Sequence, residues 1–171
     1  MKLLKTLSFL FIGLISVIGC ERDEICIEEI TPYLIIRFYD YDTPQFYKKV
    51  VDIKVELEGV EGLYEDDGAT IKPFTDSIAI PVKVTEDITK FKLTISQIDE
   101  EENIVENEDD FILTYTRENI FVSRSCGYKT IYKDVLTGLE TDNDNWILTL
   151  EPTEDPLNID NQESAHVKIY H

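Results

Sequence analysis

The sequence predicts an all-β protein, built as a single antiparallel β-sandwich domain that follows a short N-terminal extension. Apolar and polar residues alternate with a period of two in several segments, which is typical of strands with one buried and one solvated face. These segments follow one another at short intervals and are separated by polar turns, as in antiparallel sandwiches. No segment has a convincing helical period, although residues 132–139 could form a short helix.

Residues 1–19 have the features of a cleaved signal peptide. Lys2 and Lys5 form a basic start, and residues 7–18 are an apolar stretch of about a dozen residues. That length suits the core of a signal peptide and falls short of the roughly 20 residues that a membrane-spanning helix needs. Because charged residues follow directly, we prefer a signal peptide over a short membrane anchor or a buried helix.

The last four residues before the charged segment, Val17-Ile18-Gly19-Cys20, resemble a bacterial lipobox, although Val17 stands where leucine is commoner. A lipobox is cut before its cysteine, whose sulfur receives a diacylglycerol. Two or three acyl chains hold a protein firmly on a bilayer, whereas one chain binds marginally. We therefore expect lipidation of Cys20, a lipidated acidic tether at residues 20–31 and a folded domain at residues 32–171.

The mature chain is strongly acidic. The whole sequence has a formal charge of −19, and cleavage removes two lysines and no acid, which gives −21. Such a charge repels nucleic acids, so we expect neither DNA nor RNA as a partner. The acid excess would serve solubility or the binding of divalent cations, and we prefer solubility. The remaining 150 or so residues are enough for one domain with a core.

Alternation defines the predicted strands in chain order. Residues 33–38 begin the pattern, and residues 50–57 are expected to bury Val51, Ile53, Val55 and Leu57. Two further buried faces are expected at Phe91, Leu93 and Ile95, and at Phe111, Leu113 and Tyr115. Other strands are expected at residues 77–84, 104–106, 120–123, 128–136, 146–150 and 165–170. Turns or loops are expected at residues 65–68, 99–102, 107–110, 141–145 and 158–164.

The cysteines suggest one cross-link. If Cys20 is acylated, Cys26 and Cys126 remain as a pair in an exported chain, where disulfides persist. A bridge between them would pin the tether to the domain and close a loop of about 100 residues. Two free thiols are an alternative, because a sequence does not give the Cα spacing that a disulfide requires. A nucleophilic Cys126 is another, and it would need a base such as His166 or His171.

A basic and aromatic segment stands out in this acidic chain. It could form a groove that binds a glycan or an anion, with Arg117, Arg124, Tyr128 and Lys129 as the candidate contacts. The interpretation that we prefer is that these cations pair with acids on neighbouring strands.

The sequence shows no catalytic or metal signature. The segment at residues 142–145 carries oxygen ligands at alternate positions, but Ile147 and Thr153 stand where a calcium loop needs Gly and Glu. Ser123, Ser125 and His166 are the residue types of a hydrolase, but no G-x-S-x-G turn accompanies them. We therefore expect no metal, no cofactor and no catalytic residue. A hydrolase whose site is not visible in the sequence remains the alternative.

Four blocks of sequence carry a resemblance: CERDEIC at residues 20–26, YLIIRFYD at 33–40, DSIAIPV at 76–82 and TYTRENIFVSRSCGYKTIY at 114–132. Together they resemble a family of uncharacterised lipoproteins from Bacteroidota-type bacteria, whose domain has no known function. The resemblance implies a cysteine at the positions of Cys26 and Cys126, which supports the disulfide. It also implies the arginine and the tyrosine that stand here as Arg124 and Tyr128. It implies no activity.

The predicted location is the outer membrane. In such bacteria, acidic residues directly after the lipidated cysteine resemble a signal for surface display, and Glu21, Asp23 and Glu24 match it loosely. Attachment facing the periplasm is the alternative. The sequence thus predicts a lipid-anchored structural or binding accessory rather than an enzyme, with an envelope protein or a glycan as partner. A pocket that held His166 beside Cys126 or Ser123 would favour chemistry, and a flat aromatic patch would favour binding.

Overall fold

The computed structural model describes residues 25–27, 31–57, 71–99 and 101–171. The predicted signal peptide, Cys20 and the predicted turn at residues 65–68 lie outside the described residues. Within the described ranges every regular element is a strand, which confirms the predicted all-β class. The same ranges contain no helix with the length and apolar composition needed to span a bilayer.

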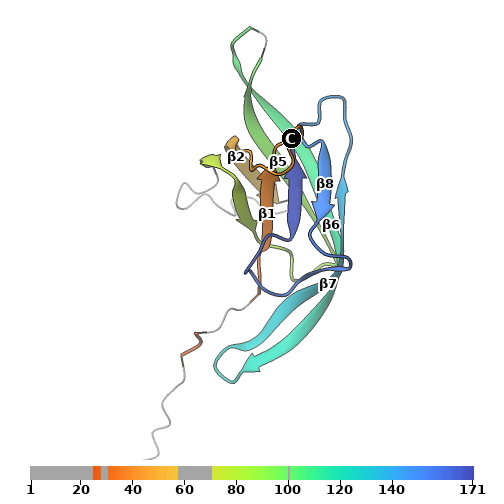
Figure 1. Cartoon of the computed structure of the whole chain (residues 1–171). Coiled ribbons are helices and arrows are strands. Elements are labelled where there is room, and N and C mark those ends of the chain that lie inside the picture. The colour runs from red at the N-terminus through yellow and green to blue at the C-terminus, as the bar shows by residue number, and fades with distance from the viewer. Residues whose placement is uncertain (1–24, 28–30, 58–70, 100) are drawn as a thin grey trace, which may run out of the picture.

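The strands form two sheets that pack on each other as a sandwich (Figure 1). The smaller sheet has the order β4-β1-β10-β8, and the larger sheet has the order β3-β2-β5-β6-β7-β9. Neighbouring strands are antiparallel as predicted, except that β1 and β10 run parallel. The strands are β1 (Leu34–Tyr39), β2 (Val50–Leu57), β3 (Ile71–Thr75), β4 (Ser77–Ile80), β5 (Ile88–Ile98), β6 (Ile104–Ser123), β7 (Gly127–Leu139), β8 (Thr149–Pro152), β9 (Leu157–Ile159) and β10 (Val167–Tyr170).

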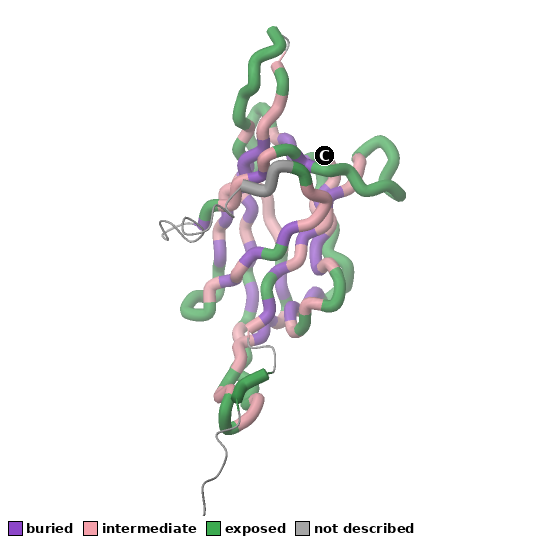
Figure 2. The backbone as a smooth tube through the Cα atoms, turned by 90° about the vertical axis from the view of Figure 1, so that its left-hand side faces the viewer, coloured by how far each residue is buried: buried purple, intermediate pink, exposed green. Residues whose placement is uncertain are grey.

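The inner faces of the two sheets share one hydrophobic core. Alternate residues of a strand point to the same face, so β1 buries Leu34, Ile36 and Phe38 and leaves the residues between them half-buried. Figure 2 shows buried positions alternating with less buried ones along the strands. Each fully buried Leu or Phe side chain contributes about 1.5–3 kcal/mol relative to an exposed one. The residues predicted for the faces of β5 and β6 are all buried: Phe91, Leu93, Ile95, Phe111, Leu113 and Tyr115.

The predicted inner face of β2 is wrong at Val51, which is 43% exposed. The cause lies at the next residue, because Asp52 has a positive φ of 49°. This conformation interrupts the regular pleat, so the first two buried positions are Val50 and Ile53, three residues apart. Ile53 and Leu57 are buried as predicted, and Val55 is half-buried.

β6 is a single strand of 20 residues, where the sequence predicted three short strands and a turn at residues 107–110. Its first part pairs with β5 and its second part pairs with β7. Two hairpins therefore extend from opposite ends of the body, one at the β5–β6 turn and one at the β6–β7 turn (Figure 1). The short helix considered at residues 132–139 is wrong, since these residues belong to β7.

Two short strands were not predicted, and the strand predicted at residues 146–150 begins later than expected. β3 was missed, and β9 lies partly in the predicted loop at residues 158–164, although its Leu157 and Ile159 are buried. β8 begins at Thr149, so Trp146 belongs to the loop before it. Trp146 is nevertheless buried, and its indole N–H donates to the carbonyl oxygen of Leu93 at 3.1 Å.

Candidate functional site

The end of the β6–β7 hairpin is the first candidate site, and we call residues 119–130 the hairpin end. Its turn comes from the segment Ser-Arg-Ser-Cys-Gly at residues 123–127. The Ser123 hydroxyl accepts a hydrogen bond of 3.1 Å from the backbone N–H of Cys126. Gly127 has a positive φ of 72°, a conformation that glycine adopts at little cost. This local chemistry reverses the chain and places Cys126 at the turn.

Cys126 forms a disulfide with Cys26, the pairing that the sequence analysis favoured. The two Cα atoms are 4.8 Å apart, within the range that disulfides adopt. A second contact lies further along the same hairpin, where the backbone N–H of Thr130 donates to the hydroxyl of Thr31 at 3.2 Å. The beginning of the described chain is thus fixed along the hairpin end. A bridged Cys126 carries no thiolate, so it does not act as a nucleophile in this state.

Arg124, Tyr128 and Lys129 all lie in the hairpin end. Arg124 is an exposed turn residue, and the exposed ring of Tyr128 packs edge-on against Phe121 with 5.4 Å between ring centroids. The ammonium group of Lys129 lies 3.5 Å from the carbonyl oxygen of Asp160. Three of the four predicted contacts therefore lie in one hairpin end, where the consecutive residues Tyr128 and Lys129 point to opposite faces of β7.

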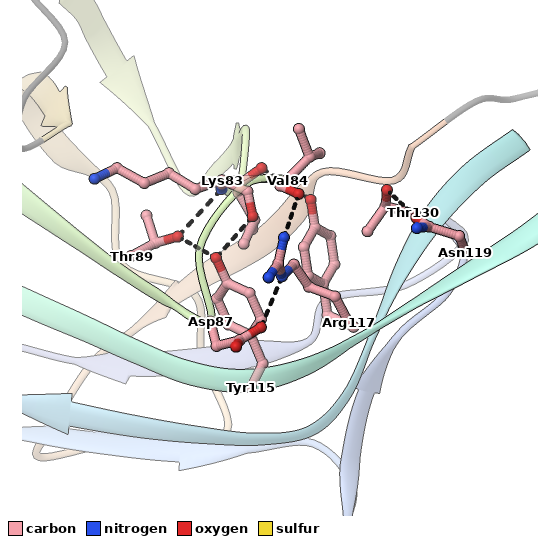
Figure 3. A network of polar contacts seen from close by, with 10 residues as sticks. Lys83, Val84, Asp87, Thr89, Tyr115, Arg117, Asn119 and Thr130 are labelled. Atoms are coloured by element: carbon pink, nitrogen blue, oxygen red, sulfur yellow. Dashed lines mark hydrogen bonds and ion pairs between the residues drawn. The ribbon is translucent and has the colours of Figure 1, made fainter.

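Arg117 does not belong to that group. It lies seven residues before Arg124 on β6, a distance of about 20 Å along an extended strand. Its Nε donates to a carboxylate oxygen of Asp87 at 2.7 Å, and its Nη1 donates to the carbonyl oxygen of Val84 at 2.7 Å (Figure 3). The bond with Asp87 raises the pKa of the guanidinium. Arg117 thus holds the β4–β5 loop, in line with the preferred interpretation of cation–acid pairing.

A closed ring of hydrogen bonds supports the same loop (Figure 3). The N–H of Lys83 donates to the hydroxyl of Thr89 at 3.1 Å, and the phenol of Tyr115 donates to the carbonyl oxygen of Lys83 at 2.8 Å. The hydroxyls of Thr89 and Tyr115 are 2.6 Å apart. Because the phenol proton points to Lys83, the hydroxyl of Thr89 donates to Tyr115. Burial raises the pKa of Tyr115, which keeps this phenol protonated and able to donate.

The residues considered for a hydrolase have structural partners. His166 is buried, and its Nδ1 accepts a hydrogen bond of 2.9 Å from the backbone N–H of Ile35. Its own backbone N–H donates to the carbonyl oxygen of Ile35 at 2.8 Å. The strand expected at residues 165–170 begins only at Val167, so His166 precedes β10, and its side chain is buried. Burial lowers its pKa, which favours the neutral ring that accepts this bond.

In the segment considered for calcium, residues 142–145, side-chain oxygens accept hydrogen bonds from backbone N–H groups of the same segment. The side chain of Asn145 accepts from the N–H of Asp142 at 2.9 Å, and Asp142 accepts from the N–H of Asp144 at 3.0 Å. This is the turn chemistry of Asp and Asn, which needs no ion. Within the described ranges, no group of three or more His, Cys, Asp or Glu residues is arranged to hold a metal ion.

A second candidate site lies on the outer face of the smaller sheet, and the sequence analysis did not identify it. We call Tyr39, Tyr47 and Tyr170 the tyrosine patch. Tyr39 and Tyr170 are paired across β1 and β10, with ring centroids 5.4 Å apart, and Tyr47 packs on Tyr39 at 5.0 Å. The guanidinium of Arg37 lies 4.7 Å from the centroid of the Tyr47 ring. The patch could have been predicted from Arg37 and Tyr39 at outward positions of β1, together with the tyrosines at positions 47 and 170.

Charged groups border the tyrosine patch. Glu151 on β8 accepts a bond of 2.7 Å from the phenol of Tyr170 and a bond of 3.0 Å from Lys168. These two bonds, the first above all, lower the pKa of Glu151. The outer face therefore offers tilted, closely packed aromatic rings beside a carboxylate and two cations, Arg37 and Lys168. Such a surface can stack on a sugar ring and form hydrogen bonds with its hydroxyls.

A comparison with family models finds one match. Residues 59–171 match a family of unknown function, DUF6452, over about two thirds of the chain. The chain belongs to this family. The DUF6452 region contains the hairpin end with Cys126, and it begins after Cys26 and β1. Searches of curated proteins and of solved structures found no match. The membership agrees with the domain of unknown function that the resemblance implied.

Proposed function

We propose that this DUF6452 chain is a lipid-anchored protein of the cell envelope, of the Bacteroidota lipoprotein type, that acts by non-covalent binding. The mature chain begins at Cys20 and is held in the outer membrane by its acyl chains. The basic start, the apolar run and the lipobox-like Val17-Ile18-Gly19-Cys20 support this proposal. Its role is that of a structural or binding accessory.

The observation that carries the proposal is the Cys26–Cys126 disulfide. Cys26 lies only six residues beyond Cys20, the lipobox cysteine. Structural disulfides persist in exported proteins and are rare where thiols are kept reduced. The bridge also has a mechanical use in an anchored protein. It attaches the membrane-proximal chain directly to the folded domain, so that only a short tether separates the domain from the membrane.

Non-covalent binding is preferred over hydrolysis because the candidate reactive groups are already used. Cys126 is bridged, and the imidazole of His166 accepts from the backbone of Ile35. The hydroxyl of Ser123 accepts from the N–H of Cys126. Each of these groups has a structural task, whereas the aromatic surfaces are exposed.

Mass spectrometry of the mature N-terminus tests the proposal. Full-length chain expressed in a bacterium of the same envelope type should yield a protein that begins at Cys20 and carries fatty acyl groups. Inhibition of lipoprotein signal peptidase should leave the uncut precursor, and Cys20→Ser should do the same without acylation. Native protein that retains residues 1–19 and carries no acyl group on Cys20 would refute it.

A second candidate function, glycan binding, is favoured by the tyrosine patch. The exposed ring of Tyr47 and the half-buried rings of Tyr39 and Tyr170 lie beside Arg37, Lys168 and Glu151. Together they supply the two contacts that sugars need, an apolar ring face and hydrogen bonds. The test is retention of the native protein on immobilised envelope polysaccharide. Tyr47→Ala should reduce retention severalfold, and Tyr33→Ala should not, since Tyr33 is about equally exposed but lies outside the patch. Equal retention of both variants would exclude the patch.

A further inference from the structure

The hairpin end exposes apolar side chains that the fold does not need. Phe121 and Tyr128 are opposite each other in the β6–β7 register and are 56% and 68% exposed. Ile25 and Ile27, on either side of the bridged Cys26, are 83% and 91% exposed. Both backbone views place this short segment beside the hairpin, beyond the body of the sandwich (Figures 1 and 2). One projecting end therefore gathers two aromatic and two aliphatic side chains in contact with solvent.

The charge of the hairpin strands differs from the charge of the rest of the protein, including the acidic tether at residues 20–31 that the disulfide joins to them. Asp and Glu make up 35 of the 171 residues, about one in five, yet residues 119–133 contain none. The same segment contains Arg124, Lys129 and Lys133. Exposed aromatic rings flanked by cations are the composition that proteins place at the headgroup level of a bilayer, where rings lie at the boundary and cations meet phosphates.

The disulfide limits how far this end can lie from a membrane. Six residues of chain lead from Cys20 to Cys26, and six extended residues span about 20 Å at most. Since Cys26 is bonded to Cys126, acyl chains on Cys20 would keep the turn of the hairpin within that distance of the bilayer.

We propose that the hairpin end is a membrane-contact element that rests on the phospholipid headgroups, with Phe121 and Tyr128 in the interfacial layer and Arg124 and Lys129 near lipid phosphates. This inference rests on the proposed lipid anchor, and it adds the orientation of the domain. β6 runs for 20 residues, about 65 Å, from this end to the opposite hairpin. The β5–β6 hairpin then points away from the bilayer and presents Ile98 and Ile104 at its tip.

Depth-dependent fluorescence quenching tests this orientation on the native acylated protein. The protein is placed in vesicles of phosphatidylethanolamine and phosphatidylglycerol that carry brominated acyl chains. Tyr128→Trp adds a reporter at the hairpin end. Ile104→Trp adds a matched reporter at the opposite end, because the side chain of Ile104 is 78% exposed. The unmodified protein gives the background from Trp146, which is buried. We expect the emission of the first reporter to shift to shorter wavelength and to lose more than half its intensity, with no change in the second.

The outcomes separate this inference from the proposed anchor. Protein that floats with the vesicles and carries acyl groups, but shows equal quenching of both reporters, refutes the membrane contact and leaves the anchor intact. A blue shift at position 128 without quenching by bromine indicates a contact with a second copy, and it also refutes the membrane contact. If the native protein carries no acyl groups and does not bind the vesicles, both the membrane contact and the proposed anchor are refuted. A further variant, Phe121→Ser with Tyr128→Ser, should still float with the vesicles, and its hairpin should exchange backbone amide hydrogens as fast as it does without vesicles.

Discussion

The carboxylate of Asp109 accepts a hydrogen bond of 2.7 Å from the backbone N–H of Ile147, 38 residues further along the chain. Its other oxygen accepts from the side-chain amide of Asn145 at 3.0 Å. Asp109 is only 1% exposed, and this burial raises the pKa of its carboxyl group, although the two hydrogen bonds oppose the shift. The contact fixes the β7–β8 loop against β6, so that Trp146 and Ile147 enter the core.

We predict that Asp109→Ala lowers the free energy of unfolding by about 2–4 kcal/mol, because it leaves two buried N–H donors without an acceptor. Urea unfolding followed by the fluorescence of Trp146 measures this loss. Asp110→Ala is the matched control, since Asp110 is the next residue on the same strand and is less buried. It should change the free energy by less than about 0.5 kcal/mol. Equal effects of the two substitutions would contradict the role of Asp109.

The same residue shows why sequence reasoning failed in part. A cluster of Asn, Glu and Asp at residues 107–110 is the composition of a turn, yet β6 passes through it. These residues pair with residues 92–95 of β5, and the Asp109 side chain bonds to Asn145 and Ile147. The composition of the segment contains none of these partners. Alternation did predict the buried faces of β5 and β6, because every second residue of those strands enters the core. It failed on β2, where a single positive φ at Asp52 changes the pattern.

The candidate site was predictable to a similar extent. Cysteine counting in a chain predicted to be exported favoured the pair that the structure joins, and charge contrast singled out the hairpin end. Arg117 was grouped wrongly with that end. It is close to Arg124 in sequence, but seven residues of extended strand separate the two by about 20 Å. The tyrosine patch was missed because it depends on the parallel pairing of β1 with β10, which joins the two ends of the domain. Pairings of this kind leave no local signal.

Loss of the disulfide should destabilise the domain. A loop of 100 residues is closed by Cys26–Cys126, and chain entropy sets an upper value of about 4–5 kcal/mol, of which real bridges often deliver less. We predict that Cys126→Ala lowers the melting temperature by about 5–10 °C, measured by circular dichroism. Cys26→Ala should give the same shift, because either change opens the same loop. Unchanged melting, together with two titratable thiols in the native protein, would contradict the prediction.

Stability should fall as the pH decreases through the range in which His166 titrates. The pKa of His166 is lowered by burial, so the unfolded chain takes up a proton at a higher pH than the folded one. Stability is therefore fully present above the unfolded pKa near 6.5 and is lost as the pH drops toward the folded value. His166→Asn keeps an acceptor for the N–H of Ile35 without titrating, and it should reduce the slope of unfolding free energy between about pH 7 and pH 5.

A second histidine contributes to the same range and supplies the control. Burial also lowers the pKa of His171, whose ring packs against Phe38 and Trp146. His171→Asn should therefore remove its own share of the slope, and the double variant should remove both. Urea unfolding at a series of pH values measures the slopes. A slope in His166→Asn equal to that of the unmodified protein would show that His166 titrates normally.

The hydrogen-bonded ring at the β4–β5 loop should depend on the phenol of Tyr115. Tyr115→Phe removes the donor to the carbonyl oxygen of Lys83 and the acceptor for the hydroxyl of Thr89, while keeping the aromatic ring. We predict a loss of about 1–2 kcal/mol in the free energy of unfolding, because two buried polar groups lose a partner. We also expect faster amide exchange at Lys83. Tyr128→Phe is the control, since Tyr128 is exposed at the hairpin end and should change the stability by less than about 0.5 kcal/mol. If Tyr115→Phe is as stable as Tyr128→Phe, the hydrogen-bonded ring does not hold the loop. The bonds of Arg117 to Asp87 and Val84, and the bond of Tyr132 to Val82, then hold it without the ring.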